Sequence, residues 1–196
     1  MKVTFFERLG AYLIDMFIVN FIFLIICLGL GNSTSETEKL MQELDDKLVA
    51  SEITPEQYLK EYKIVLYDYQ KENIFQSGIS LALTIAYYVI FQYMNQGQTI
   101  GKKILKLRVV RKDNEKPISI LKGLLRSMII YSILSSTILL GLLHLFNANK
   151  YFNAYTILLA LEGLFMITTI MFVLYRKDGR GLHDIITNTL VIKENN

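Results

Sequence analysis

Four long apolar runs constrain this chain more than any other feature of its sequence. They cover residues 11–30, 75–94, 118–146 and 151–175, and each reaches the roughly 20 residues that a helix needs to cross about 30 Å of hydrocarbon. With 52% hydrophobic and 20% charged residues among 196, the chain is too apolar for an ordinary soluble domain. The runs also lack the alternating pattern of a membrane β-barrel. We therefore predict a single domain, an all-α membrane protein with four transmembrane helices.

The charges that flank these runs predict how the chain crosses the membrane. Residues 96–117 carry seven Lys and Arg against two acids, whereas residues 32–74 carry five Lys against ten acids. Short cytoplasmic loops are enriched in Lys and Arg, so we expect a basic cytoplasmic loop at 96–117, a cytoplasmic tail at 176–196 and an acidic extracytoplasmic insertion at 32–74. Both termini are then cytoplasmic, and the protein is a multi-pass protein of the plasma (cytoplasmic) membrane whose basic face contacts anionic lipid headgroups. We expect the first run to remain a membrane helix and not a cleaved signal peptide, because Asp15 interrupts it.

The acidic insertion has a helical pattern of its own. Apolar residues recur at every third or fourth position over 40–48 and 58–69, which predicts two amphipathic helices that form a hairpin. Thr54, Pro55 and Gln57 suit the N-cap, the first helical position and the capping box of the second helix. The hairpin is either a solvated lid or an acidic vestibule or partner site.

Charged and glycine-rich elements lie within and beside the apolar runs. The first is RLGAYLID at 8–15, the second is GQTIGKKILKLRVV at 97–110, and the third is GLHD at 181–184, followed by TLVI at 189–192.

These three elements resemble those of the RDD family of membrane proteins, which is named for one Arg and two Asp. The resemblance covers nearly the whole chain and implies that Arg8, Asp15 and Asp184 are the signature charges, with Arg126 at the place of a common additional arginine. It also implies a role in transport, since cation/proton antiport is suggested for some members. The acidic insertion at 32–74 departs from the family pattern.

The spacing of the signature charges bears on what they do. Arg8 and Asp15 are seven residues apart, so they share a helix face at about 10 Å along the axis. At that distance we expect a third group to bridge them, either Arg126, His183 or Asp184. Such a cluster either holds helix ends together or tunes an Asp so that a proton and a cation compete for it.

Glu162 lies near the middle of the fourth run, where a charge is poorly solvated. It is either a proton-binding carboxylate or a Glu held by hydrogen bonds from Ser135 or Ser136 of another helix.

The glycine-rich element predicts a tight cytoplasmic turn. Gly97 and Gly101 permit close backbone approach, while Lys102 and Lys103 are expected to contact lipid headgroups. The element lacks the ending of a phosphate-binding loop. The alternating stretch that follows, 106–111, is predicted to pair with 189–193 as a small cytoplasmic β-ribbon.

Composition excludes several functions and leaves two. The chain has one Cys and two His, and no catalytic or metal-ligand constellation occurs at a recognisable spacing, so we expect no enzyme, no metal site and no cofactor. It also has no nucleic-acid-binding motif. The protein is then either a transporter of cations, protons or small solutes, which four helices form most easily as a homo-oligomer, or a non-transporting subunit that binds or assembles a partner membrane protein.

Overall fold

The computed structural model describes residues 3–30 and 36–194. Within these residues three helices are long and apolar enough to cross a membrane. They are α1 (Phe5–Gly29), the helix Ile74–Met94 and α9 (Ala148–Tyr175). The pair α7 (Ile120–Ile130) and α8 (Ile133–Leu145) makes a fourth span when the two are taken together. The prediction of a mostly helical protein, with helices long and apolar enough to cross a membrane, is therefore confirmed.

The third apolar run is not the single helix that residues 118–146 predict. The helices α7 and α8 meet at an angle of 72°, and Ser132 between them has a left-handed backbone with a φ of 55°. No Gly or Pro lies between Ile130 and Ile133, so the usual sequence signal of a kink is missing. The apolar character continues through the break, which is why hydropathy alone indicates one helix.

The second span also departs from a regular α-helix. It begins as α4 (Ile74–Ile85), continues as the π-helical stretch η1 (Ala86–Phe91) and ends as α5 (Gln92–Met94). Two consecutive tyrosines of η1, Tyr87 and Tyr88, are both buried, and their rings meet edge to face at 5.0 Å. Such π-helical turns are rare and occur mostly at functional sites.

Two capping boxes determine where helices begin. The backbone N–H of Gln57 donates to Thr54 Oγ1 at 3.2 Å, and the N–H of Thr54 donates to Gln57 Oε1 at 2.9 Å, as the sequence predicts for α3 (Pro55–Glu72). Thr4 and Glu7 form the same pair at the start of α1. The first helix therefore begins six residues before the apolar run, and this extension brings Arg8 into the helix.

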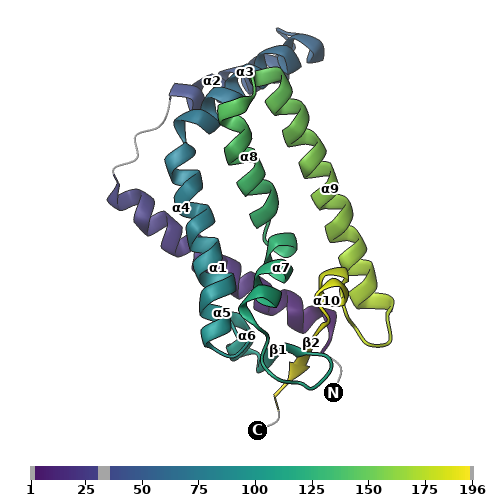
Figure 1. Ribbon diagram of the computed structural model, residues 1–196. Helices are drawn as coiled ribbons and strands as arrows, with labels where there is room; N and C mark the ends of the chain where they lie inside the picture. Colours follow the sequence, from purple (N-terminus) through teal and green to yellow (C-terminus); the bar gives the residue numbers. More distant parts are fainter. Residues whose placement is uncertain (1–2, 31–35, 195–196) are drawn as a thin grey trace.

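A helical hairpin covers one end of the molecule. The helices α2 (Glu36–Val49) and α3 contact each other and lie across the ends of α4, α8 and α9 (Figure 1). The Tyr67 hydroxyl donates to the carbonyl oxygen of Phe146 at 2.7 Å, which fastens α3 to the connection between α8 and α9. We call this end the hairpin end. Residues 32–35 of the predicted insertion lie outside the described residues.

The opposite end carries a small sheet, and we call it the sheet end. Here β1 (Leu107–Arg111) pairs antiparallel with β2 (Thr189–Lys193), with Val109 opposite Val191, which confirms the pairing predicted from the sequence. Next to it lie α6 (Ile100–Ile104) and α10 (Leu182–Ile186). Both ends of the chain lie at this end (Figure 1). A buried core cluster joins the sheet to α1, and it contains Val3, Ala11, Leu107, Val109, Ile118 and Val191.

Two glycines allow these elements to pack closely. Gly97 has a φ of +96°, and a Cβ there would lie 2.1 Å from the carbonyl oxygen of Val109. A Cβ at Gly101 would lie 2.3 Å from the carbonyl oxygen of Ala11. The α6 backbone therefore lies directly against α1, which is possible only without a side chain at Gly101.

We expect Gly101→Ala to destabilise the protein, because its methyl group forces α6 away from α1. Overpacking of this kind costs about 2 kcal/mol, which lowers the melting temperature in detergent by about 4–8 °C. The matched control is Gly163→Ala in α9, where a Cβ meets nothing within 4 Å. Equal melting temperatures for the two variants would show that the close approach is unimportant.

Candidate functional site

A fully buried carboxylate joins three parts of the chain at the sheet end. Asp184, which has no exposed surface, accepts hydrogen bonds from Arg8 Nη1 at 2.7 Å and from Arg126 Nε at 3.0 Å. It also accepts from the backbone N–H of Gly181 at 3.2 Å and from Thr189 Oγ1 at 3.2 Å. The helices α1, α7 and α10 and strand β2 are thus connected through one side chain.

The charges around Asp184 keep it ionised. Burial raises the pKa of this carboxyl, but the charge of Arg126, followed by His183 and Arg8, outweighs burial and holds the pKa well below its usual value. Burial lowers the pKa of the neighbouring His183 imidazole, which is 6% exposed. Asp184 is therefore a permanent anion between two guanidinium groups.

Asp15 lies in a second, separate site. Its carboxylate is 0% exposed and accepts from the Tyr87 hydroxyl at 2.7 Å, from Thr99 Oγ1 at 2.5 Å and from the backbone N–H of Gly101 at 2.7 Å. The expected bridge between Arg8 and Asp15 is wrong, because Arg8 and Arg126 both bind Asp184 instead. Neutral donors from η1 and from the start of α6 satisfy the hydrogen-bonding capacity of Asp15. The sequence gives little sign of the Tyr87 contact, because Tyr87 lies in a π-helical stretch, where α-helical spacing does not predict which way a side chain faces.

The structure separates the two lysines of the glycine-rich element. Lys103 is exposed, and its predicted contact with headgroups stays a prediction. Lys102 is only 8% exposed, and its ammonium group donates to Gln92 Oε1 at 3.0 Å. It therefore faces the interior of the sheet end, because the short helix α6 packs against α1 and carries Lys102 inward.

The sequence profile of the RDD family matches residues 2–188. The chain belongs to the RDD family. No curated protein and no solved structure matches it. In this RDD protein Arg8 and Asp184 form a direct ion pair, whereas Asp15 lies with neutral partners.

Glu162 lies at the break in the third span of this RDD protein. Ser132 Oγ donates to Glu162 Oε2 at 3.2 Å, and Ser135 Oγ donates to Glu162 Oε1. The prediction that Ser135 contacts Glu162 is therefore confirmed, while Ser136 lines a cavity nearby. Ser132 could not be predicted as a partner, because it reaches Glu162 only where the helix breaks. Among the described residues, no cation forms an ion pair with Glu162.

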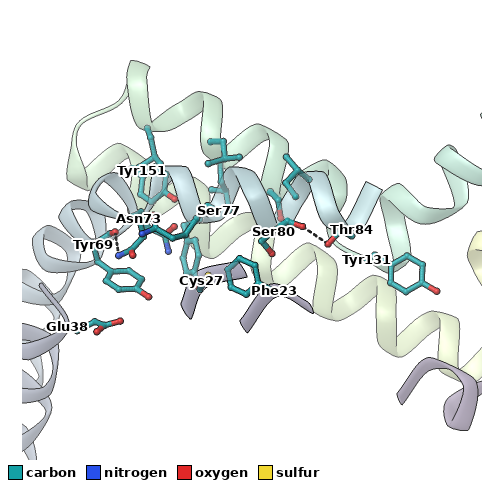
Figure 2. Close-up of a pocket in the computed structure, with 18 residues that line it drawn as sticks. Phe23, Cys27, Glu38, Tyr69, Asn73, Ser77, Ser80, Thr84, Tyr131 and Tyr151 are labelled. Atoms are coloured by element: carbon teal, nitrogen blue, oxygen red, sulfur yellow. Dashed lines mark hydrogen bonds between the residues drawn. The ribbon is translucent and has the colours of Figure 1, made fainter. Parts of the chain in front are cut away.

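Two cavities lie on either side of this break. The hairpin-end cavity, about 540 Å³ in volume, is bounded by α1, α2, α3, α4, α8 and α9. Figure 2 shows Tyr131 at one end of its labelled residues, with Tyr69, Tyr151 and Glu38 toward the other end. The sheet-end cavity, about 340 Å³, is lined by Arg8, Asp15 and Arg126, among other residues. Tyr131 lines both cavities.

Aromatic stacking holds Tyr131 at this boundary. Its ring stacks on Tyr88 of η1 with centroids 3.5 Å apart and on Tyr12 of α1 with centroids 6.0 Å apart. The backbone carbonyl of Tyr88 in turn accepts from Ser127 Oγ at 3.1 Å, which binds η1 to α7. The three spans therefore meet at a small group of tyrosines, between the two cavities.

We expect Asp184→Asn to be strongly destabilising, because it leaves Arg8 and Arg126 buried without an anion. Breaking a buried pair in this way costs about 3–5 kcal/mol, so the melting temperature in detergent should fall by about 10 °C. The control is Glu194→Gln, which breaks the pair between Arg108 and Glu194, whose side chains are 25% and 35% exposed. An exposed pair contributes less than about 1 kcal/mol; similar losses in both variants would contradict the architectural role of Asp184.

We also expect Lys102 to make stability depend on pH. Burial, followed by the charge of Arg126, lowers its pKa from 10.5 to about 7. Between these values the unfolded chain binds a proton that the folded chain does not, so the free energy of unfolding rises with pH. Below about pH 7 both states bind the proton, and the cost of burying the charge is fully present.

The melting temperature of the wild type should therefore rise by several degrees from about pH 7 to pH 9 relative to that of Lys102→Gln. Lys103→Gln, which changes an exposed neighbour, should follow the wild type. Parallel pH profiles for the wild type and Lys102→Gln would show that Lys102 does not titrate in this range.

Proposed function

We propose that this RDD protein is a plasma-membrane transporter that exchanges protons for small cations or other small polar solutes, with Glu162 as the proton-binding carboxylate. One observation carries the proposal. A carboxylate near the middle of α9 faces a break in a neighbouring span, and the break lies between two cavities that share Tyr131. Discontinuous helices near the bilayer midplane are a common way to build ion and substrate sites in transporters.

The chemistry at the break suits a proton or a hard monovalent cation. Two carboxylate oxygens and the hydroxyls of Ser132 and Ser135 lie together, and oxygen atoms are the ligands that hard cations prefer. A carboxylate inside a membrane span costs about 2.5–3.5 kcal/mol. Since no cation among the described residues neutralises Glu162, a proton or a transported cation can do so.

The signature charges have a different role in this proposal. Asp15 and Asp184 have no exposed surface, and each accepts several hydrogen bonds at short range. A carboxylate bound in this way has little capacity left for an ion that must enter and leave. We therefore assign Asp15 and Asp184 an architectural function and keep ion coupling for Glu162.

The proposal includes an orientation. Both ends of the chain lie at the sheet end (Figure 1), next to the loop 96–117 with its excess of Lys and Arg. The positive-inside rule therefore favours a cytoplasmic sheet end and an extracytoplasmic hairpin. The hairpin-end cavity then faces outward, and the acidic α2 and α3 lie where a cation would approach.

The alternative function, a membrane subunit that binds or assembles a partner protein, is favoured by one surface. The hairpin exposes apolar side chains beside its acids, among them Leu40 (46%), Val49 (85%) and Leu59 (43%). Such residues suit a protein contact. This function requires no link between the two cavities and no proton-binding carboxylate.

Transport can be tested in proteoliposomes that contain a pH-sensitive dye. Pulses of Na⁺, K⁺ or Li⁺ should drive protons out through the wild type. Glu162→Gln should slow this exchange by at least about tenfold while keeping the wild-type melting temperature. It removes the titratable group, while its amide oxygen accepts from one of the two serine hydroxyls and its NH2 donates to the other. The control Glu194→Gln should exchange like the wild type.

The variant Asp15→Asn distinguishes an architectural role of Asp15 from a role in ion coupling. If Asp15 is architectural, this variant should lose melting temperature together with transport, since an amide cannot accept from three donors as a carboxylate does. Unchanged exchange in Glu162→Gln would overturn the assignment of Glu162. A wild type that responds to no cation would overturn cation exchange and favour the partner function.

A further inference from the structure

The sheet-end cavity lies between two helices that diverge. The helices α1 and α9 contact each other near α10 and separate toward the hairpin end (Figure 1). Apolar side chains line most of the cavity, and they include Phe5, Leu9, Ile130, Met166, Ile170 and Val173. Arg8, Lys102, Thr169 and His183 also line it. The cavity is thus amphipathic, with an apolar wall and a cationic, polar part.

Polar atoms around this cavity have unused hydrogen-bonding capacity. Among the described residues, five buried side-chain nitrogen and oxygen atoms have no hydrogen-bond partner, and three of them belong to cavity-lining residues: Arg8 Nε, Thr169 Oγ1 and His183 Nδ1. The Thr169 and His183 residues are 7% and 6% exposed. Buried polar groups without partners are rare in native proteins and call for an explanation such as a bound group.

The unused capacity is mainly that of donors. Arg8 Nε is a donor only, and the Lys102 ammonium group carries three donors of which the described residues occupy one, through Gln92. The two nearby carboxylates, Asp15 and Asp184, already accept hydrogen bonds from several groups. Three basic side chains, Arg8, Lys102 and Arg126, line the cavity, and Asp15 is the acid among its lining residues. The site therefore has room for an anion rich in acceptor oxygens.

We propose that this cavity binds one anionic phospholipid, whose phosphate contacts Arg8 and Lys102 and whose acyl chain lies along the apolar wall between α1 and α9. The apolar wall favours a lipid over a free phosphate, which would leave that wall unused. A cavity of about 340 Å³ takes only part of a lipid, so the remainder stays in the bilayer. This site is independent of Glu162 and of ion exchange.

The test compares lipids by native mass spectrometry on detergent-purified full-length protein. The protein is mixed with equal amounts of phosphatidylglycerol and phosphatidylcholine that carry the same acyl chains. We expect one retained phosphatidylglycerol, and we expect Lys102→Gln to reduce the preference for it by about fivefold, since one basic side chain contributes about 1 kcal/mol to anionic lipid binding. The matched control is Lys103→Gln, whose side chain is exposed.

A second pair of variants tests the acyl chain. Ile170→Trp fills the cavity from α9 and should abolish lipid retention. Ile167→Trp places the same side chain on the same helix at a position that is 62% exposed and does not line the cavity, so it should retain the lipid. If Lys102→Gln fails to fold, the two tryptophan variants still test whether the cavity binds a lipid.

Three results would overturn the proposal. The first is an equal loss of preference in Lys102→Gln and Lys103→Gln, which indicates general attraction of headgroups to a basic surface. The second is retention of lipid by Ile170→Trp. The third is stabilisation by inorganic phosphate alone that matches stabilisation by phosphatidylglycerol, which identifies a free anion as the ligand.

Discussion

The sheet end of this protein depends on one buried carboxylate and the two arginines that neutralise it. Asp184 has no exposed surface, and its ionised form is stable only because Arg8 and Arg126 reach it from α1 and α7. Without Asp184, both guanidinium groups would be buried with no anion, which is why removing one member of a buried ion pair costs far more than the pair itself contributes. This requirement fixes α10 beneath the spans, and α10 leads directly into β2. The position of α10 thereby brings β2 to the place where it pairs with β1.

The same reasoning separates the carboxylates of this protein into two kinds. Asp184 has charged partners and Asp15 has three short hydrogen bonds from neutral donors, so both are satisfied within the fold. Glu162 accepts from two serine hydroxyls beside a broken helix and has no cation partner in the described part of the chain. A group that must bind and release an ion has to be stable in both states. Two hydroxyls can adapt to either state, because each can donate or accept, whereas a guanidinium cannot.

The sequence predicts those features that a short residue pattern specifies. The capping box at Thr54 needs only four neighbouring residues, and the β-ribbon needs only two alternating segments. The contact between Ser135 and Glu162 followed from the need of a mid-span carboxylate for a polar neighbour. The break at Ser132 could not be predicted, because one residue with a positive φ leaves the apolar composition of the run unchanged. The burial of Lys102 was missed for a related reason: it depends on how closely Gly101 approaches α1, and a basic sequence gives no sign of that distance.

The position of Tyr131 bears on how the two cavities could be joined in the proposed transport cycle. Tyr131 directly follows α7 and precedes Ser132, so its backbone lies outside a regular helix. Two stacking contacts hold the ring, with Tyr88 and Tyr12, and an aromatic pair contributes only about 0.5–1.5 kcal/mol beyond the area that it buries. Separating whole spans would instead break buried contacts along α1, α4, α8 and α9. On the proposed function, a change in the Tyr131 side chain is therefore a less costly way to connect the cavities than a movement of helices, and the break at Ser132 supplies the local freedom that such a change requires.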